Sequence, residues 1–297
     1  MRRAAGLQVL FGFLLLLYAF SVSVLAQNAA PAHRILISCI PKHEAVTLTL
    51  SDLSSRELTL KGLTPVDTND ALDYVVVFDT SRSVRENTNS EFASVSAVLH
   101  SFMRGGRDRG LAIVFGEVPI AGSRFVTDPE IILNALKSPP QGRGTALYDA
   151  MFMGVSKLNE LPNPRPRYMI VISDGEDTWS KATRADVIPR LVASDVHVIA
   201  VNLPGYPNGV GRGEKALRDL AQPSGGIVLH IERGTSESDL KKYSRQEWSR
   251  LESFFKYRYW LEVETKDLNA RVVHPDLKTR AKCALIAPEV VAYQPTK

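Results

Sequence analysis

The sequence lacks several motifs on which common protein functions depend. Only two of its 297 residues are cysteine and six are histidine, and no Cys/His spacing typical of a zinc site occurs. A Gly-x-Ser-x-Gly elbow is absent, which argues against nucleophilic hydrolysis of that type. No basic run stands out and the net charge is only +4, so nucleic acid is not the expected partner.

The N-terminus has the features of an export signal. Arg2 and Arg3 precede a long apolar run, and a Val-x-Ala sequence stands directly before Gln27. This pattern predicts a secretory signal over residues 1–26 and an exported protein, periplasmic or extracellular. An uncleaved membrane anchor is the alternative, because the run approaches the roughly 20 residues that span a bilayer. A lipid anchor is not expected, since no cysteine stands at the cleavage point.

Export would place the two cysteines, Cys39 and Cys283, in an oxidising compartment. They could form a disulfide that clamps the two ends of the mature chain, or remain two buried free thiols. Closing so long a loop could stabilise the fold by roughly 5 kcal/mol in the chain-entropy model. The sequence leaves both states open.

The central part of the chain alternates between apolar runs and stretches with helical spacing. Such alternation is typical of an α/β fold with a mostly parallel sheet and helices on both faces. We expect strands over residues 73–78, 111–115, 168–172, 196–201 and 227–231, a short edge strand over 124–126 and a long amphipathic helix over 236–255.

Short β-rich runs flank this α/β region on both sides. In the run 45–50, Val46, Leu48 and Leu50 alternate with polar residues, as in a half-buried strand. We expect the two flanks to meet in one small β layer. The predicted organisation is a signal peptide (1–26), an N-terminal β segment (27–70), an α/β domain (71–256) and a C-terminal β segment (257–297).

Oxygen-bearing side chains follow the predicted strands at three places. Asp79, Ser81 and Ser83 form an Asp-x-Ser-x-Ser sequence after the first buried strand, while Thr145 and Asp174 stand in later loops. In an open α/β sheet, ligands bind at the carboxyl ends of the strands, so these residues should share one edge. Because all the donors are oxygens, the sequence predicts Mg²⁺, with Mn²⁺ or Ca²⁺ as substitutes.

These motifs, in this order, resemble the metal-ion-dependent adhesion site (MIDAS) of von Willebrand factor A (VWA) domains. The resemblance covers residues 73 to about 255, and it implies a doubly wound, Rossmann-like VWA sheet. The stretches 144–150 (GTALYDA) and 173–178 (SDGEDT), together with the β flanks, are similar to the secreted bacterial VWA-related proteins.

The resemblance also implies roles for the site residues. Ser81 and Ser83 would coordinate the metal through their hydroxyls, Thr145 directly or through water, and Asp79 and Asp174 mostly through bound waters. Hydroxyls and waters leave the charge of a cation poorly neutralised, so its open position attracts a carboxylate. An Asp or Glu of a partner protein would then complete the metal's coordination, and the chain would be a non-enzymatic binding protein.

Other interpretations remain open at this point. Arg82 stands where many relatives have glycine; it could recruit an acidic partner at the rim of the site or be an ordinary solvated side chain. Asp79 followed by the acidic turn 174–177 superficially resembles haloacid-dehalogenase phosphotransferases, but those need a second Asp where this chain has Ser81. A structural or regulatory module of an envelope assembly is a further alternative, which the sequence does not separate from adhesion.

Overall fold

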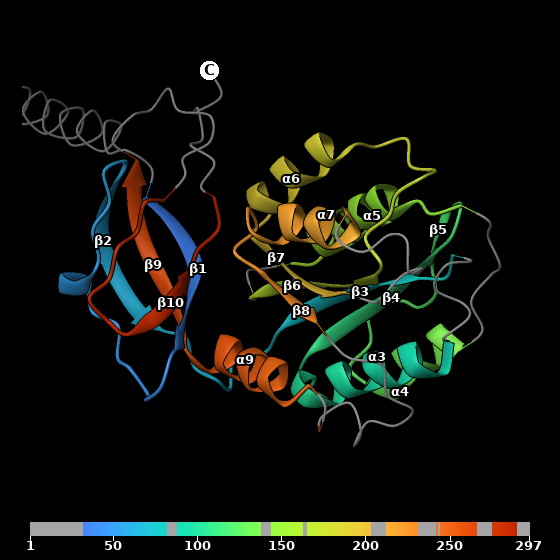
Figure 1. Cartoon of the computed structure of the whole chain (residues 1–297), viewed down its shortest axis with the longest axis horizontal. Helices are drawn as coiled ribbons and strands as arrows, with labels where there is room; N and C mark the ends of the chain where they lie inside the picture. The colour runs from blue at the N-terminus through green and yellow to red at the C-terminus, as the bar shows by residue number, and fades with distance from the viewer. Residues whose placement is uncertain are drawn as a thin grey trace, which may run out of the picture.

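The computed structural model describes residues 32–81, 88–137, 144–162, 165–202, 212–230, 242, 244–265 and 275–289. Within these ranges the protein is mixed α/β, with a six-stranded, mostly parallel sheet beside a four-stranded antiparallel sheet (Figure 1). The predicted signal sequence, residues 1–26, lies outside the described residues. In the part of the chain that is described, every helix is too short or too polar to cross a membrane.

The larger sheet has the strand order β5-β4-β3-β6-β7-β8. All neighbouring strands are parallel except β4 and β5, which form an antiparallel hairpin. The central strand β3 is buried along its whole length, as its run of valines predicts. The strands are β3 (Asp73–Asp79), β4 (Arg109–Phe115), β5 (Pro119–Ala121), β6 (Arg167–Ser173), β7 (Val196–Asn202) and β8 (Ile227–His230).

Helices cover both faces of this sheet, because alternate side chains of the buried strands point to opposite sides. On one face Val76 and Phe78 of β3 pack in a core with α3 (Thr88–Phe102), α4 (Pro129–Lys137) and α9 (Arg245–Lys256). On the other face Val75 and Val77 pack with α5 (Leu147–Asn159), α6 (Arg184–Ala193) and α7 (Arg212–Ala221).

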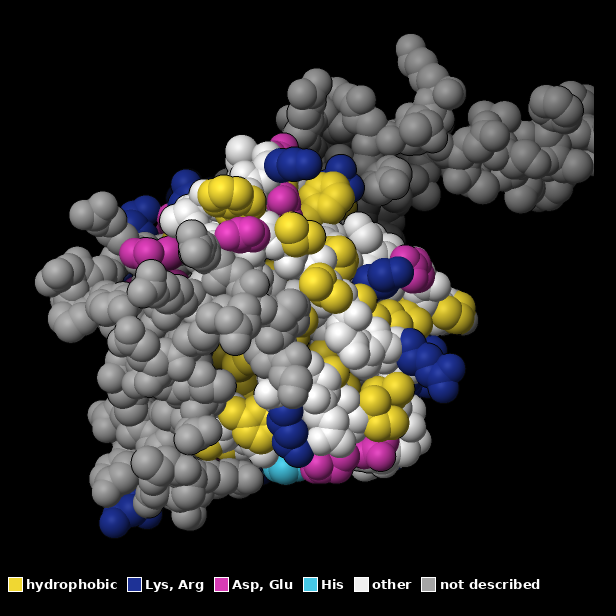
Figure 2. All heavy atoms as spheres, turned by 90° about the vertical axis from the view of Figure 1, so that its right-hand side faces the viewer, with side chains coloured by type: hydrophobic (Ala, Val, Ile, Leu, Met, Phe, Trp, Pro, Cys, Tyr) yellow, Lys and Arg dark blue, Asp and Glu magenta, His cyan; other side chains and the backbone are white. Residues whose placement is uncertain are grey.

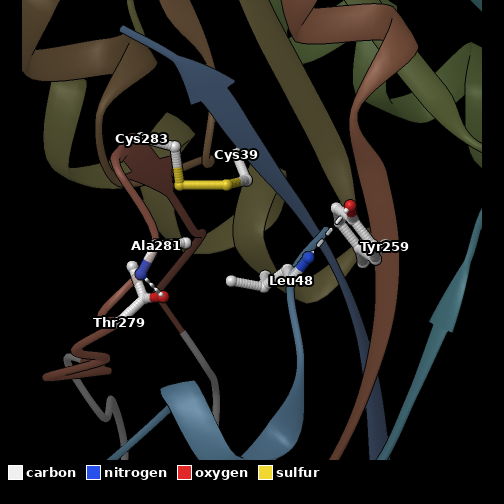
Figure 3. Close-up of a disulfide and its surroundings, with 6 residues drawn as sticks. All are labelled: Cys39, Leu48, Tyr259, Thr279, Ala281 and Cys283. Carbon is white, nitrogen blue, oxygen red and sulfur yellow. Dashed lines mark hydrogen bonds between the residues drawn. A yellow bond between two sulfur atoms is a disulfide. The ribbon is translucent and has the colours of Figure 1, made fainter. Parts of the chain in front are cut away.

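The smaller sheet brings together strands from both ends of the chain. Its order is β10-β1-β9-β2, all antiparallel. Its strands are β1 (Ala32–Pro41), β2 (Leu58–Pro65), β9 (Arg258–Thr265) and β10 (Cys283–Ile286). Cys39 of β1 and Cys283 of β10 form a disulfide across the neighbouring strands, with Cα atoms 5.5 Å apart (Figure 3). Of the two states open from the sequence, the structure therefore contains the disulfide.

Two expected strands are wrong. Residues 45–49 have no regular structure and lead into a short 3₁₀ helix, η1 (Leu50–Asp52). Leu48 is buried there, and its backbone N–H donates to the Tyr259 hydroxyl at 3.3 Å instead of to a strand (Figure 3). The alternation of apolar residues thus reflects burial against the small sheet, not pairing within it.

The second error concerns the edge strand expected over 124–126. The edge strand of the large sheet beside β4 is β5, which pairs with β4 directly after the turn at residues 116–118. Val126 forms only an isolated bridge to Gly110. The expected helix 236–255 is described only in part: α9 begins at Arg245, and residues 236–241 lie outside the described residues.

A buried arginine joins the two sheets. Arg258 begins β9, and its Nε donates to the carbonyl of Phe255 at the end of α9, at 2.7 Å. Its Nη1 donates to the Tyr168 hydroxyl of β6 at 3.0 Å. The Tyr168 ring lies beside the buried His197 of β7, with ring centroids 5.7 Å apart. Burial lowers the pKa of His197 to about 4, and the nearby charge of Arg258 adds to this effect.

Removing the disulfide should destabilise the whole chain. We expect the Cys39→Ala/Cys283→Ala variant to lose roughly 3 to 5 kcal/mol of unfolding free energy, because the bridge links residues 244 positions apart. Guanidinium unfolding measures the change. Wild type unfolded in a reducing agent is the control, because it loses the disulfide but keeps both cysteine side chains. If reduced wild type is as stable as the oxidised form, the prediction is contradicted.

His197 should make the fold sensitive to acid. The unfolded chain binds a proton at this side chain near its ordinary pKa of 6.5, whereas the folded chain does so only near pH 4. Stability is therefore complete above about pH 6.5 and falls as the pH drops toward 4. We expect wild type to lose up to about 3 kcal/mol relative to His197→Gln between pH 7 and pH 4. If the unfolding free energies of wild type and His197→Gln fall by the same amount between pH 7 and pH 4, the prediction is contradicted.

Candidate metal centre

The two candidate carboxylates lie at the carboxyl ends of neighbouring parallel strands. Asp79 is the last residue of β3, and Asp174 directly follows β6. The helix after β3 packs on one face of the sheet and the helix after β6 on the other. The loops therefore diverge between these two strands, at the switch point where open α/β sheets bind their ligands.

Asp79 is completely buried and both of its carboxylate oxygens accept hydrogen bonds. The Ser81 N–H donates to Oδ1 at 2.8 Å, and the Ser173 hydroxyl donates to Oδ2 at 2.7 Å. Burial nevertheless raises the pKa of Asp79 to about 6, and the nearby negative charge of Asp174 contributes to the rise. In both of these contacts the donor is a neutral group, so neither contact balances the negative charge of the ionised carboxylate.

The opposite end of the same strand shows the usual solution for a buried carboxylate. Asp73 begins β3, is also buried, and receives two hydrogen bonds from the Arg109 guanidinium at 2.7 and 2.8 Å. Arg165 is a second cation, 3.7 Å away. Within the described ranges no lysine or arginine forms such an ion pair with Asp79. A buried, unbalanced anion is costly, so the donor set at this end suits a bound cation.

Asp174 is held by a sharp turn after β6. Its Oδ1 accepts a hydrogen bond from the Glu176 N–H at 3.0 Å. Gly175 has a positive φ of +82°, and a Cβ there would lie 2.2 Å from the Gly213 carbonyl oxygen of α7. Glycine adopts this φ without steric cost, and the absence of a Cβ permits this approach. The turn places the nearly buried Asp174 close enough to Asp79 for their charges to interact.

Thr145 precedes α5 and is fixed through its backbone to the loop after β6. Its N–H donates to the Thr178 hydroxyl at 3.1 Å, and its carbonyl accepts the N–H groups of Thr178 and Trp179 at 2.9 and 3.1 Å. The next residue, Ala146, donates its N–H to the Gly116 carbonyl after β4 at 2.7 Å. Thr145 therefore lies between two loops at the same end of the sheet.

The chain after β3 is attached to the same end. Both the backbone N–H and the hydroxyl of Thr80 donate to the Phe115 carbonyl of β4, each at 2.8 Å. Ser81, the next residue, is buried. The loops after β3, β4 and β6 and the segment before α5 thus meet around one edge. Ser83 and Arg82, predicted as ligand and rim residue, lie outside the described residues.

The sequence interpretation missed the residues that support the candidate ligands. Ser173 donates to Asp79 and accepts the Gly175 N–H at 3.0 Å, so one hydroxyl links the strand end to the acidic turn. Asp177 accepts the Tyr148 N–H at 3.2 Å, and Asp149 accepts the N–H groups of residues 181 and 182. These supporting residues belong to the motifs GTALYDA and SDGEDT, and their place in those motifs was the only feature of the sequence that indicated a part in the site.

The donor types agree with a hard cation. The four described candidates supply two carboxylates and two hydroxyls, from Asp79, Asp174, Ser81 and Thr145. Oxygen donors of this kind suit Mg²⁺, Mn²⁺ or Ca²⁺. Among the described residues, there is no group of three or more His, Cys, Asp or Glu side chains that could hold a metal ion. A carboxylate-rich or zinc-type centre is therefore not seen in this part of the chain.

Comparison with known proteins yields structural likeness only. No protein-family model matches the sequence, and no curated protein matches it. An aerotolerance-related membrane protein from Bacteroides fragilis is 17% identical, with a TM-score of 0.45, and the match covers 61% of this chain and 100% of that one. BatB from Bacteroides thetaiotaomicron, a conserved hypothetical protein, is 17% identical over the same shares, with a TM-score of 0.40.

A pilus adhesin is also among the similar structures. SpaC from Lactobacillus rhamnosus GG is 12% identical with a TM-score of 0.45, and the match covers 80% of this chain and 46% of that one. At these identities and scores, the likeness assigns neither a family nor a function to this chain.

The turn at Gly175 should be more sensitive to substitution than the turn at Gly106. Gly106 is a matched control, because its φ is +77° and a Cβ there would meet nothing within 4 Å. We expect Gly106→Ala to cost about 1 kcal/mol for the backbone alone. Gly175→Ala should cost about 2 to 4 kcal/mol, since the overlap with α7 is added. Urea unfolding measures both, and equal losses would contradict the close contact.

Proposed function

We propose that the chain is an exported VWA-type protein with a doubly wound α/β domain, whose MIDAS-type site holds a divalent cation, Mg²⁺ above all. Through that cation it binds an acidic residue of a partner protein. The observation that carries the proposal is Asp79: it is buried at the switch point of the sheet, beside a second carboxylate, without an ion pair among the described residues.

The proposed roles of the residues follow from their positions. Asp79 and Asp174, at the carboxyl ends of β3 and β6, would supply negative charge and act mostly through bound waters. Ser81 and Thr145 would offer their hydroxyls, and Ser83, outside the described residues, would complete the set. A bound cation would supply an open, poorly neutralised coordination position that a partner's carboxylate fills. Ser173 and Thr80 position the loops.

A binding function is favoured over an enzymatic one. The residue two positions after Asp79 is Ser81, whose backbone N–H already donates to that carboxylate. A phosphotransferase of the haloacid-dehalogenase type would need a carboxylic acid there to protonate the leaving group. The buried hydroxyl residue at this position suits coordination better than general acid catalysis.

Export is supported by the disulfide. Cys39 and Cys283 lie on neighbouring strands of the small sheet and are bonded to each other. Structural disulfides persist in oxidising compartments such as the periplasm or the extracellular space. This agrees with a signal peptide over residues 1–26 and with a partner outside the cytoplasm.

Loss of Asp79 should weaken metal binding while the fold is retained. We expect Asp79→Ala to weaken Mn²⁺ binding at least tenfold, measured by the electron paramagnetic resonance signal of free Mn²⁺, with an unchanged circular dichroism spectrum.

Asp67→Ala is the matched control, because this carboxylate is exposed on the loop before β3 and, among the described residues, accepts a hydrogen bond from the nearby Asn69 N–H alone. It should bind Mn²⁺ like wild type. Capture of proteins from an envelope extract, in Mg²⁺ and in EDTA, then tests the bridge to a partner. Equal capture by wild type in EDTA would contradict the proposal.

A further inference from the structure

Two large apolar side chains are exposed on loops beside the candidate site. Trp179 follows β6 and is 59% exposed, and Val118, on the hairpin after β4, is 62% exposed. Figure 2 shows the side of the molecule on which β5 lies in Figure 1, where hydrophobic side chains are exposed among charged ones. Single exposed apolar residues are normal on protein surfaces, so Trp179 and Val118 are of interest only because of where they lie relative to the candidate site.

Trp179 is attached directly to the segment that carries Thr145. Its backbone N–H donates to the Thr145 carbonyl at 3.1 Å. A Cβ on Gly144 would lie 3.1 Å from the Cβ, Cδ2 and Cε3 atoms of Trp179, so the side chain lies against the backbone of that glycine. The indole is thus held at one side of a proposed metal ligand while most of its surface remains in solvent.

Val118 lies on a hairpin that is hydrogen-bonded to the same segment. The hairpin that carries it begins at Gly116, whose carbonyl accepts the Ala146 N–H at 2.7 Å. The same hairpin follows Phe115, whose carbonyl accepts both hydrogen bonds from Thr80. One short segment, residues 144–146, therefore links two loops that each carry an exposed apolar side chain.

We propose that Trp179 and Val118 form an apolar subsite of the metal centre. It would receive a large aliphatic side chain that stands next to the carboxylate in an extended segment of the partner protein. This proposal rests on the proposed function, because the cation would hold the carboxylate and so place its neighbour over the subsite. Tryptophan contributes strongly at protein interfaces, where its large, rigid surface is buried at low entropic cost.

The test compares two synthetic peptides of equal length and charge. Each has a single Asp, flanked on both sides by Leu in one peptide and by Ser in the other. In saturating Mg²⁺, the full chain should bind the Leu-flanked peptide about tenfold more tightly, as expected for partial burial of a leucine. Fluorescence polarisation measures both affinities, and neither peptide should bind in EDTA.

Variants then test whether the preference for the Leu-flanked peptide depends on Trp179 and Val118. Trp179→Ser should reduce the ratio of the two affinities to near one without changing Mn²⁺ affinity, and Val118→Ser should reduce it in part. Ile131→Ser is the control, since Ile131 is 46% exposed on α4. It should leave the ratio unchanged.

The outcomes separate the two proposals. If both peptides bind equally in Mg²⁺, or if Trp179→Ser and Val118→Ser keep the preference, the subsite is overturned and the metal bridge stands. If Ile131→Ser removes the preference as well, the subsite is also overturned. If the chain binds Mn²⁺ but neither peptide, both the subsite and the acidic partner are overturned.

Discussion

The carboxylate of Asp79 is the constraint on which the candidate site depends. It lies buried at the end of the central strand, where the Ser81 N–H and the Ser173 hydroxyl satisfy its oxygens without balancing its charge. Burial raises the pKa of this carboxyl group to about 6, and the nearby charge of Asp174 adds to the rise. The fold therefore holds two acidic groups close together, and a bound cation would offset the cost of ionising them.

The disulfide-bonded small sheet and the candidate site lie at opposite ends of the strands of the large sheet. The small sheet, with its disulfide, lies beyond the amino ends of the strands of the large sheet, and the candidate site lies at their carboxyl ends (Figure 1). At the amino end the buried Asp73 is balanced by Arg109. At the carboxyl end, glycines and backbone hydrogen bonds arrange the loops around Asp79 and Asp174. Two buried carboxylates on one strand thus have different surroundings, a guanidinium at one end and neutral donors at the other.

Much of the architecture was predictable because its causes are local. Runs such as residues 75–77 mark strands that are buried on both faces, and their alternation with helical spacing predicts a parallel sheet. The prediction for residues 45–50 was wrong, because alternating burial does not by itself require a neighbouring strand. The edge strand was wrong for a similar reason: short strands depend on the turn that precedes them and on the partner available.

The sequence by itself determined the mixed α/β class and the oxygen-bearing residues that follow the strands, because both depend on local composition and order along the chain. Only the tertiary structure decided that both ends of the chain pair in one sheet, that Ser173 supports Asp79, and that Trp179 lies against Gly144. Those contacts join residues far apart in sequence. They depend on strand order and on close packing, which no periodic pattern of residues specifies.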